Sequence, residues 1–212
     1  MNRLVLVGVT LLAVASWFLF DPPAPREAWS FSTQPPPAKT GAPGEGTCID
    51  CHGGSPLNEA GGSVTIGGVP ASYLPNQTYT LTVTVMNPSQ HRWGFELVPV
   101  RDSNNTMAGS FTNTTLFTTT QSFGGKDYIS HTTINPGQDG TFAGQTSGMW
   151  TFAWTAPGAG TGTVTLYAAG NAANGTGTNA GDKIYTTSVS ATEGSTTAVD
   201  ATTWGRIKML YR

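Results

Sequence analysis

The chain has few charged residues and almost no cysteine. Only 10% of its 212 residues are charged, against about 25% in typical soluble domains, and the formal net charge is −2. It has no run of Lys or Arg that could neutralise a series of phosphates, which excludes a nucleic-acid-binding protein that works through a basic surface. The two cysteines lie three positions apart, so a framework of disulfides is excluded as well.

Threonine, glycine and proline are abundant, with 34, 27 and 14 copies. Thr is β-branched and Gly and Pro mark turns, so this composition favours many short strands over helices. The hydrophobic content of 38% suffices for the core of one globular domain. No G-x-S-x-G motif and no paired carboxylates occur, so we expect no enzyme that works through side chains alone.

An uncharged apolar run at Leu4–Phe20 follows the single cation Arg3. Such a segment directs export, either as a cleaved signal peptide or as a retained transmembrane anchor. A helix over the run would span about 26 Å, and its aromatic end suits a membrane interface, which favours the anchor. We therefore predict a signal anchor or signal peptide at residues 1–20. The remainder would lie outside the cytoplasm, in the periplasm or on the cell surface, attached to the inner membrane.

Half of the prolines fall between residues 21 and 47. A stretch of this kind prefers polyproline II and acts as a semi-rigid spacer. The sequence therefore predicts a linker at 21–47 that holds the following motif away from the membrane.

Alternating apolar and polar residues follow the cysteines. Residues 78–86 read TYTLTVTVM, and residues 149–155 read MWTFAWT with three aromatic side chains on one face. Similar runs occur at Ser63–Ile66, Trp93–Val100, Met107–Thr112, Tyr128–Thr132, Gly162–Ala168 and Lys183–Ser190. About eight short strands with turns between them predict an all-β protein, an antiparallel sandwich at 63–191. Residues 171–178 are expected to form a low-complexity loop between two strands.

The tail at 192–212 differs in kind from the sandwich. Trp204, Ile207 and Tyr211 recur at helical spacing, with cations between them. This pattern predicts a short basic amphipathic helix. It could pack on the sandwich, on a partner or on an anionic membrane.

Residues 48–52 form the one motif that indicates a specific chemistry. Cys48, Cys51 and His52 have the C-x-x-C-H spacing of c-type haem attachment. The two thiols can add to the vinyl groups of one porphyrin, and the adjacent imidazole then binds the iron. Haem attachment of this type occurs outside the cytoplasm, where the apolar run would send the chain. We therefore predict a haem-binding loop at 48–62 with one covalent haem c.

Three other interpretations of the motif remain open. A redox-active pair of thioredoxin type needs a helix that begins at the first cysteine, and the sequence Gly53-Gly54-Ser55-Pro56 argues against one. A zinc site would need a second close pair of ligands, which is absent. A plain disulfide with an adjacent histidine is the third.

Few residues could supply the sixth iron ligand. His131 is the first choice because it lies on an expected strand, and two histidine ligands would leave no open position, as in electron-transfer haems. The other candidates are His91, Met86, Met107 and Met149. An open or Met-ligated iron would favour a sensor or a carrier of higher potential.

Five ordered blocks of the sequence resemble bacterial exported proteins that have a Reeler-like (reelin N-terminal-like, "choice-of-anchor") β-sandwich. The blocks are Gly41–Cys48 with Cys51-His52, Arg92–Leu97, Tyr128–Thr132, Trp150–Pro157 and Tyr167–Gly175. The resemblance covers about residues 41 to 190. It implies an extracytoplasmic sandwich fused to a C-x-x-C-H loop, with His131 facing the haem.

We therefore expect a membrane-tethered, extracytoplasmic monohaem c-type cytochrome that carries electrons between redox partner proteins. It could be a subunit of a respiratory or photosynthetic complex, and it would be an electron carrier and not an enzyme. The alternatives are a structural or adhesion module of the cell surface, or a haem-based sensor with open iron, for which peroxidase-like activity is not excluded.

Overall fold

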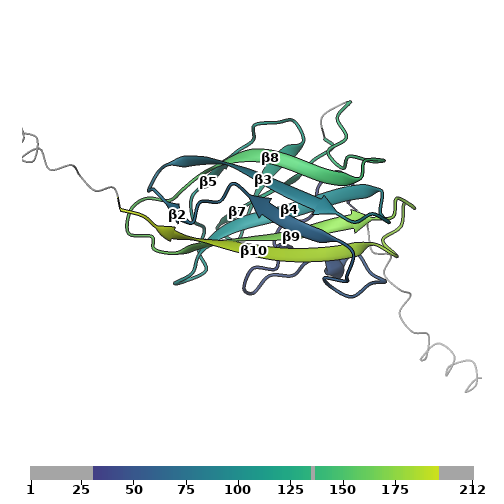
Figure 1. Ribbon diagram of the computed structural model, residues 1–212, viewed down its shortest axis with the longest axis horizontal. Helices are drawn as coiled ribbons and strands as arrows, with labels where there is room; N and C mark the ends of the chain where they lie inside the picture. Colours follow the sequence, from purple (N-terminus) through teal and green to yellow (C-terminus); the bar gives the residue numbers. More distant parts are fainter. Residues whose placement is uncertain (1–30, 135–136, 196–212) are drawn as a thin grey trace, which may run out of the picture.

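Two β-sheets face each other in the computed structural model, which describes residues 31–134 and 137–195 (Figure 1). One sheet has the strand order β1-β3-β8-β5, and the other has the order β2-β10-β9-β4-β7-β6. The strands are β1 (Ser63–Gly67), β2 (Ser72–Tyr73), β3 (Thr78–Met86), β4 (Arg92–Arg101), β5 (Ser110–Thr112), β6 (Thr118–Phe123), β7 (Lys126–His131), β8 (Ser147–Thr155), β9 (Val164–Ala173) and β10 (Lys183–Glu193). The predicted all-β sandwich is confirmed.

The core lies between the sheets and is rich in aromatic side chains. Strand β3 turns its Leu and Val side chains inward and its threonines outward, as the alternation predicts. On β8 the inward face carries Trp150, Phe152 and Trp154, all almost fully buried. The indole N–H groups of Trp150 and Trp154 donate to the carbonyls of Gly140 and Ala108 at 2.8 and 3.0 Å. Burial of each such side chain stabilises the fold by roughly 1.5–3 kcal/mol.

The chain from residue 31 to residue 56, here called the strap, lies on the outer face of the six-stranded sheet. The strap explains why β4 is buried on both of its faces, because an antiparallel sheet usually has one solvent-exposed face. Thr40 and Ala42 of the strap are buried, and Ala42 packs on Val98 and Val100. Residues 31–47 of the expected linker therefore lie against the sheet, whereas residues 21–30 lie outside the described part.

Glu45 fastens the strap to β7. One of its carboxylate oxygens pairs with Lys126 Nζ at 2.9 Å and accepts a hydrogen bond from the Tyr128 hydroxyl at 2.8 Å. The other oxygen accepts from Thr40 Oγ1 at 2.6 Å. Burial, together with the Glu45 carboxylate, raises the pKa of Tyr128, so this hydroxyl stays protonated and keeps donating.

Replacing Glu45 by alanine should loosen the strap. Lys126, Tyr128 and Thr40 would each lose a partner in a shielded position, and removing one member of a buried pair costs about 3 kcal/mol. In denaturant unfolding, the midpoint concentration of the variant should be lower than that of the wild type. Glu59→Ala is the control, because Glu59 forms a partly exposed pair with Lys183, which is screened by solvent, and its loss should change the midpoint little. Equal unfolding midpoints for the two variants would contradict the role of Glu45 in holding the strap on β7.

The strands differ from the prediction in number and extent. Strands β2 and β6 were not expected, because β2 has only two residues and β6 reads TTTQSF without apolar alternation. Met107 makes only an isolated bridge to Val100, so the expected strand from Met107 is shorter. Strand β9 runs to Ala173, so the first three residues of the loop expected at 171–178 belong to a strand.

The predicted transmembrane helix is not among the elements that the structure describes. Within residues 31–134 and 137–195, no helix is long and apolar enough to cross a membrane. The predicted export segment at 1–20 and the basic helix expected near the C-terminus lie outside the described residues.

Candidate functional site

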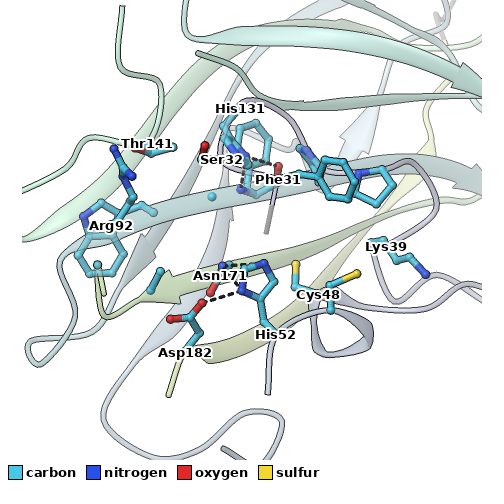
Figure 2. Close-up of a pocket in the computed structure, with 18 of the residues that line it drawn as sticks. Phe31, Ser32, Lys39, Cys48, His52, Arg92, His131, Thr141, Asn171 and Asp182 are labelled. Carbon is cyan, nitrogen blue, oxygen red and sulfur yellow. Dashed lines mark hydrogen bonds and ion pairs between the residues drawn. The ribbon is translucent and has the colours of Figure 1, made fainter. Parts of the chain in front are cut away.

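A cavity lies between the strap and the end of the six-stranded sheet where β4 begins and β9 ends (Figure 2). Its volume is about 190 Å³, whereas one water needs roughly 10–15 Å³. The strap, the first residues of β4, the last residue of β7, the end of β9 and the loop after it all contribute to its walls. The cavity can therefore hold a ligand many times larger than water.

The strap places the C-x-x-C-H motif on the cavity wall. Cys48–Asp50 form one turn of 3-10 helix, which Thr47 caps by accepting from the Ile49 N–H. The His52 N–H donates to the Cys48 carbonyl at 2.9 Å, which keeps the imidazole beside both thiols. Both cysteines are free. They therefore do not form the disulfide that one interpretation of the motif required.

The environment of Cys48 does not suit a redox-active thiol pair. Burial, and next the negative charge of Glu96, raise the pKa of the Cys48 thiol to about 12. Reactive cysteines in C-x-x-C pairs have a pKa below the ordinary value, because the thiolate is the nucleophile. The structure therefore argues against the thioredoxin-type interpretation.

Asp182 holds the ring of His52. The Nδ1 atom of His52 lies 2.6 Å from Asp182 Oδ2, and the Asp182 side chain is 1% exposed. The other carboxylate oxygen of Asp182 accepts from the Asn174 N–H at 3.0 Å. With Nδ1 engaged in this way, Nε2 is the nitrogen left to bind a ligand.

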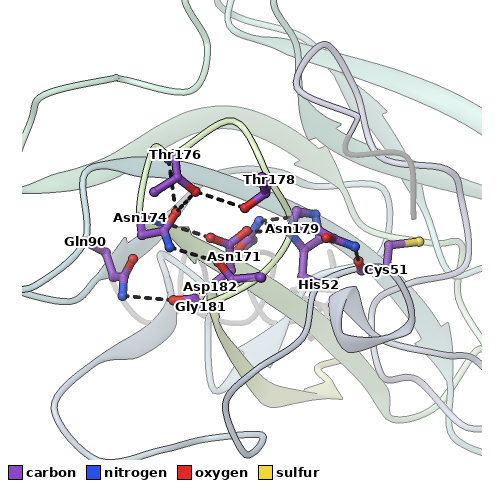
Figure 3. A network of polar contacts seen from close by, with 11 residues as sticks. Cys51, His52, Gln90, Asn171, Asn174, Thr176, Thr178, Asn179, Gly181 and Asp182 are labelled. Atoms are coloured by element: carbon purple, nitrogen blue, oxygen red, sulfur yellow. Dashed lines mark hydrogen bonds and ion pairs between the residues drawn. The ribbon is translucent and has the colours of Figure 1, made fainter. Parts of the chain in front are cut away.

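The loop between β9 and β10 holds the C-x-x-C-H motif in place through hydrogen bonds (Figure 3). Asn179 donates from its side chain to the Cys51 carbonyl at 2.6 Å, and its own carbonyl accepts from the Gly53 N–H at 2.9 Å. Gly53 in turn accepts from the Gly181 N–H at 2.9 Å. This loop is therefore a structural part of the site.

Sequence reasoning missed Asp182, Asn171 at the end of β9 and Asn179 of this loop. The amide nitrogen of Asn171 lies 3.1 and 3.4 Å from the two ring nitrogens of His52. The only sequence signal that pointed to Asp182 was its place as a lone acid directly after a loop rich in Asn and Gly. Its pairing with His52 spans 130 residues, so spacing could not show it.

His131 faces the same cavity from the end of β7. It is buried, and its Nδ1 lies 3.1 Å from the backbone N and 3.3 Å from the backbone O of Phe95. Burial lowers the pKa of His131 to about 4, so the imidazole is neutral at pH 7. Gly94 permits this packing, since a Cβ there would come within 2.8 Å of the His131 ring.

All four predicted site residues, Cys48, Cys51, His52 and His131, therefore line one cavity. Figure 2 shows His52 and His131 on opposite sides of it. The other candidate ligands lie elsewhere. His91, Met86 and Met149 are exposed and do not line the cavity, and Met107 packs in a small cluster beneath the strap, where its sulfur accepts from the Asp127 N–H.

Arg92 lines the cavity on the side away from the cysteines (Figure 2). Its contact with Asp139 is loose at 3.7 Å, and its Nε is buried without a hydrogen-bond partner among the described residues. The cavity thus combines two thiols, two imidazoles, the cations Lys39 and Arg92 and the Asp182 carboxylate with apolar walls that include Phe31 and Pro36.

The prediction of metal binding is wrong for an ion held by side chains alone. In the described part of the chain, no group of three or more His, Cys, Asp or Glu side chains could hold a metal ion. Zinc bound by Cys48, Cys51 and His52 with a distant histidine is therefore not supported, because zinc sites need three or four such ligands.

No family model matches the chain, and no curated protein is a significant match. Among solved structures, the Reelin-N domain of F-spondin is 24% identical over 67% of this chain and 93% of that one, with a TM-score of 0.45. A human F-spondin reeler domain (21% identity, 64% and 93% coverage, TM-score 0.43) and a cohesin module of a Clostridium perfringens family 33 glycoside hydrolase (11%, 63% and 96%, 0.43) are also similar. These likenesses concern the sandwich alone. Nothing about function rests on them.

Proposed function

We propose that the chain is an extracytoplasmic c-type cytochrome that carries one electron at a time between redox partner proteins, with a single haem in the cavity. One observation carries the proposal. His131, which is distant in sequence from the C-x-x-C-H motif, lines the same cavity as Cys48, Cys51 and His52, on the opposite side from His52. His52 and His131 would supply the two protein ligands of six-coordinate haem iron.

The hydrogen-bond partners of the two histidines are compatible with this role. Asp182 engages Nδ1 of His52. Nδ1 of His131 lies between two Phe95 backbone groups, the N–H at 3.1 Å, which donates to an unprotonated Nδ1, and the carbonyl at 3.3 Å, which accepts from a protonated one. When each Nδ1 carries the proton, each Nε2 keeps its lone pair for a metal. His131 is moreover neutral at pH 7, the form in which imidazole acts as a ligand. The donor set present therefore fits a haem.

Arg92 could bind the propionate groups of a porphyrin. The vinyl groups that react with thiols and the propionate groups lie on opposite edges of the macrocycle. With the vinyl edge at Cys48 and Cys51, the propionates would face the side where Arg92 has an unpartnered Nε. A guanidinium there would neutralise a carboxylate and hydrogen-bond to it.

A haem supplies a centre that accepts and returns one electron. The protein's contribution is to hold the axial imidazoles, to exclude water and to set the local charge. The Asp182 carboxylate places negative charge against His52, which favours the oxidised state and lowers the potential. With His131 as the second ligand, no position stays open for a substrate, which supports electron transfer over sensing or peroxidase chemistry.

A structural or adhesion module of the cell surface is the second candidate. The observation that favours it is the outer face of the four-stranded sheet, where Met86 and Met149 are 47% and 58% exposed among threonines. Exposed apolar side chains of this kind occur on protein-binding surfaces. This candidate predicts that replacing both Cys48 and Cys51 leaves the biological role intact.

The test is an absorption spectrum of the exported full-length protein, produced in a host with the haem c maturation machinery. We expect a low-spin spectrum whose bands shift on reduction, and a pyridine haemochrome spectrum typical of two thioether bonds. The Cys48→Ser, Cys51→Ser double variant is the matched control and should lack covalent haem. A colourless protein would refute the proposal and leave the surface module.

A further inference from the structure

Glu96 is a buried acid that the proposed electron carrier does not otherwise use. It lies in the middle of β4 and is 0% exposed, on the face of the sheet that the strap covers. Its Oε2 accepts from the Lys39 backbone N–H at 2.6 Å. Its Oε1 is buried and has no hydrogen-bond partner in the described part of the chain. A carboxyl group in this position is costly to ionise, because ionisation would leave a buried charge without a counter-charge in contact.

The next strand leaves a second polar atom unpartnered beside Glu96. Ser130 of β7 is directly opposite Glu96 in the strand register, and its Oγ is also buried without a partner within residues 31–134 and 137–195. The other cross-strand neighbour, Ala169 of β9, is apolar. A hydroxyl in this position can donate to the Glu96 carboxylate or accept from the protonated carboxyl group, so it can serve both protonation states.

This pair lies next to the candidate haem site. Glu96 is close enough to Cys48 for its charge to raise the pKa of that thiol, and Lys39 and Cys48 both line the cavity. A change of charge in the cavity would therefore act on Glu96 through a shielded, low-dielectric region, where electrostatic effects are strong.

We propose that, at pH values around 8, Glu96 takes up a proton when an electron enters the site and releases it when the electron leaves. The inference rests on the proposed function. A partner protein supplies the electron and the solvent supplies the proton, which forms an O–H bond at Oε1 and turns the carboxylate into a carboxylic acid. Oxidation by the next partner reverses both transfers. The charge of the buried region is thus unchanged over the cycle.

The charged surroundings of Glu96 support this uptake and release of a proton. Burial raises its pKa to about 8, with Glu45 of the strap adding to the increase, whereas the Lys39 N–H and charge oppose it. Lys39 Nζ is itself paired with Asp50, and Tyr128 of β7 feels the charge of Glu96 but stays protonated. A group that titrates near neutral pH responds to one added electron, whereas an ordinary surface acid is fully ionised in both redox states.

The experiment is a potentiometric titration of the holoprotein at a series of pH values. An electron raises the proton affinity of Glu96, so the potential of the wild type should fall as the pH rises around 8. The limiting slope is 59 mV per tenfold change in proton concentration for one electron. The Glu96→Gln variant, which retains an acceptor for Lys39, should have a flat potential over this range. Glu59→Gln, at a partly exposed acid that does not line the cavity, should behave as the wild type does.

Two results would overturn the inference: a wild-type potential that does not change with pH, or the same slope in Glu96→Gln as in the wild type. If that variant does not fold, reduced-minus-oxidised infrared spectra of the wild type decide the matter. They should show a protonated carboxyl band that appears on reduction and shifts in D2O, and its absence would contradict the proton uptake. A preparation with no haem spectrum would contradict the proposed function itself, whereas bound haem with a flat potential contradicts only the role of Glu96.

Discussion

The His131→Ala variant should lose the low-spin, six-coordinate spectrum of the wild type and become high-spin. His131 is the imidazole opposite His52 in the cavity, and its removal leaves no other donor among the candidate ligands within reach. Carbon monoxide should bind the reduced variant readily and the wild type poorly. Added imidazole should restore the low-spin spectrum, because the truncated side chain leaves space for it.

The matched control is His91→Ala. His91 is exposed and lies outside the cavity wall, so its loss should change neither the spectrum nor the binding of carbon monoxide. Circular dichroism of both variants checks the fold, since His131 also bonds to the Phe95 backbone. A low-spin spectrum that survives in His131→Ala would remove His131 as the axial ligand.

Asp182→Asn should raise the midpoint potential by about 60 mV, the equivalent of a tenfold change in the redox equilibrium. The carboxylate that contacts Nδ1 of His52 at 2.6 Å stabilises positive charge on the ligand and the iron, and an amide does so less. The amide oxygen can still accept from His52, so the ring should keep its place and the spectrum should stay low-spin. Potentiometry of the holoprotein at one fixed pH measures the shift.

Asp102→Asn is the control for the loss of one negative charge. Asp102 is exposed in the turn after β4, at the end of that strand away from the cavity, so its replacement should leave the potential unchanged. An equal potential in Asp182→Asn and the wild type would reduce Asp182 to a purely structural role in the loop.

The architecture was accessible from sequence because the alternation on β3 and β8 is regular. One face of each strand is apolar, so burial of that face follows directly from the period of two. The strap could not be predicted in this way. Its contacts with β7 depend on single polar side chains such as Glu45, and proline-rich composition alone does not distinguish a free linker from one that packs on a sheet.

The part of the candidate site that forms a local motif could be predicted from the sequence. Cys48, Cys51 and His52 are neighbours, and their spacing indicates their use. His131 was a candidate by elimination and by resemblance, and the structure places it at the cavity. Asp182 and Glu96 gave no such signal, since their roles arise from burial and from partners that are far away in the sequence.

The most direct test of the account is the intact mass of the exported full-length protein, followed by peptide mapping of residues 48–52. A haem bonded through both thiols adds its full mass to the polypeptide and keeps it there under denaturing conditions. We predict one haem per chain, located on the peptide that contains Cys48 and Cys51 and lost in the double serine variant. A mass equal to that of the bare polypeptide, from cells that mature other c-type cytochromes, would contradict the central claim.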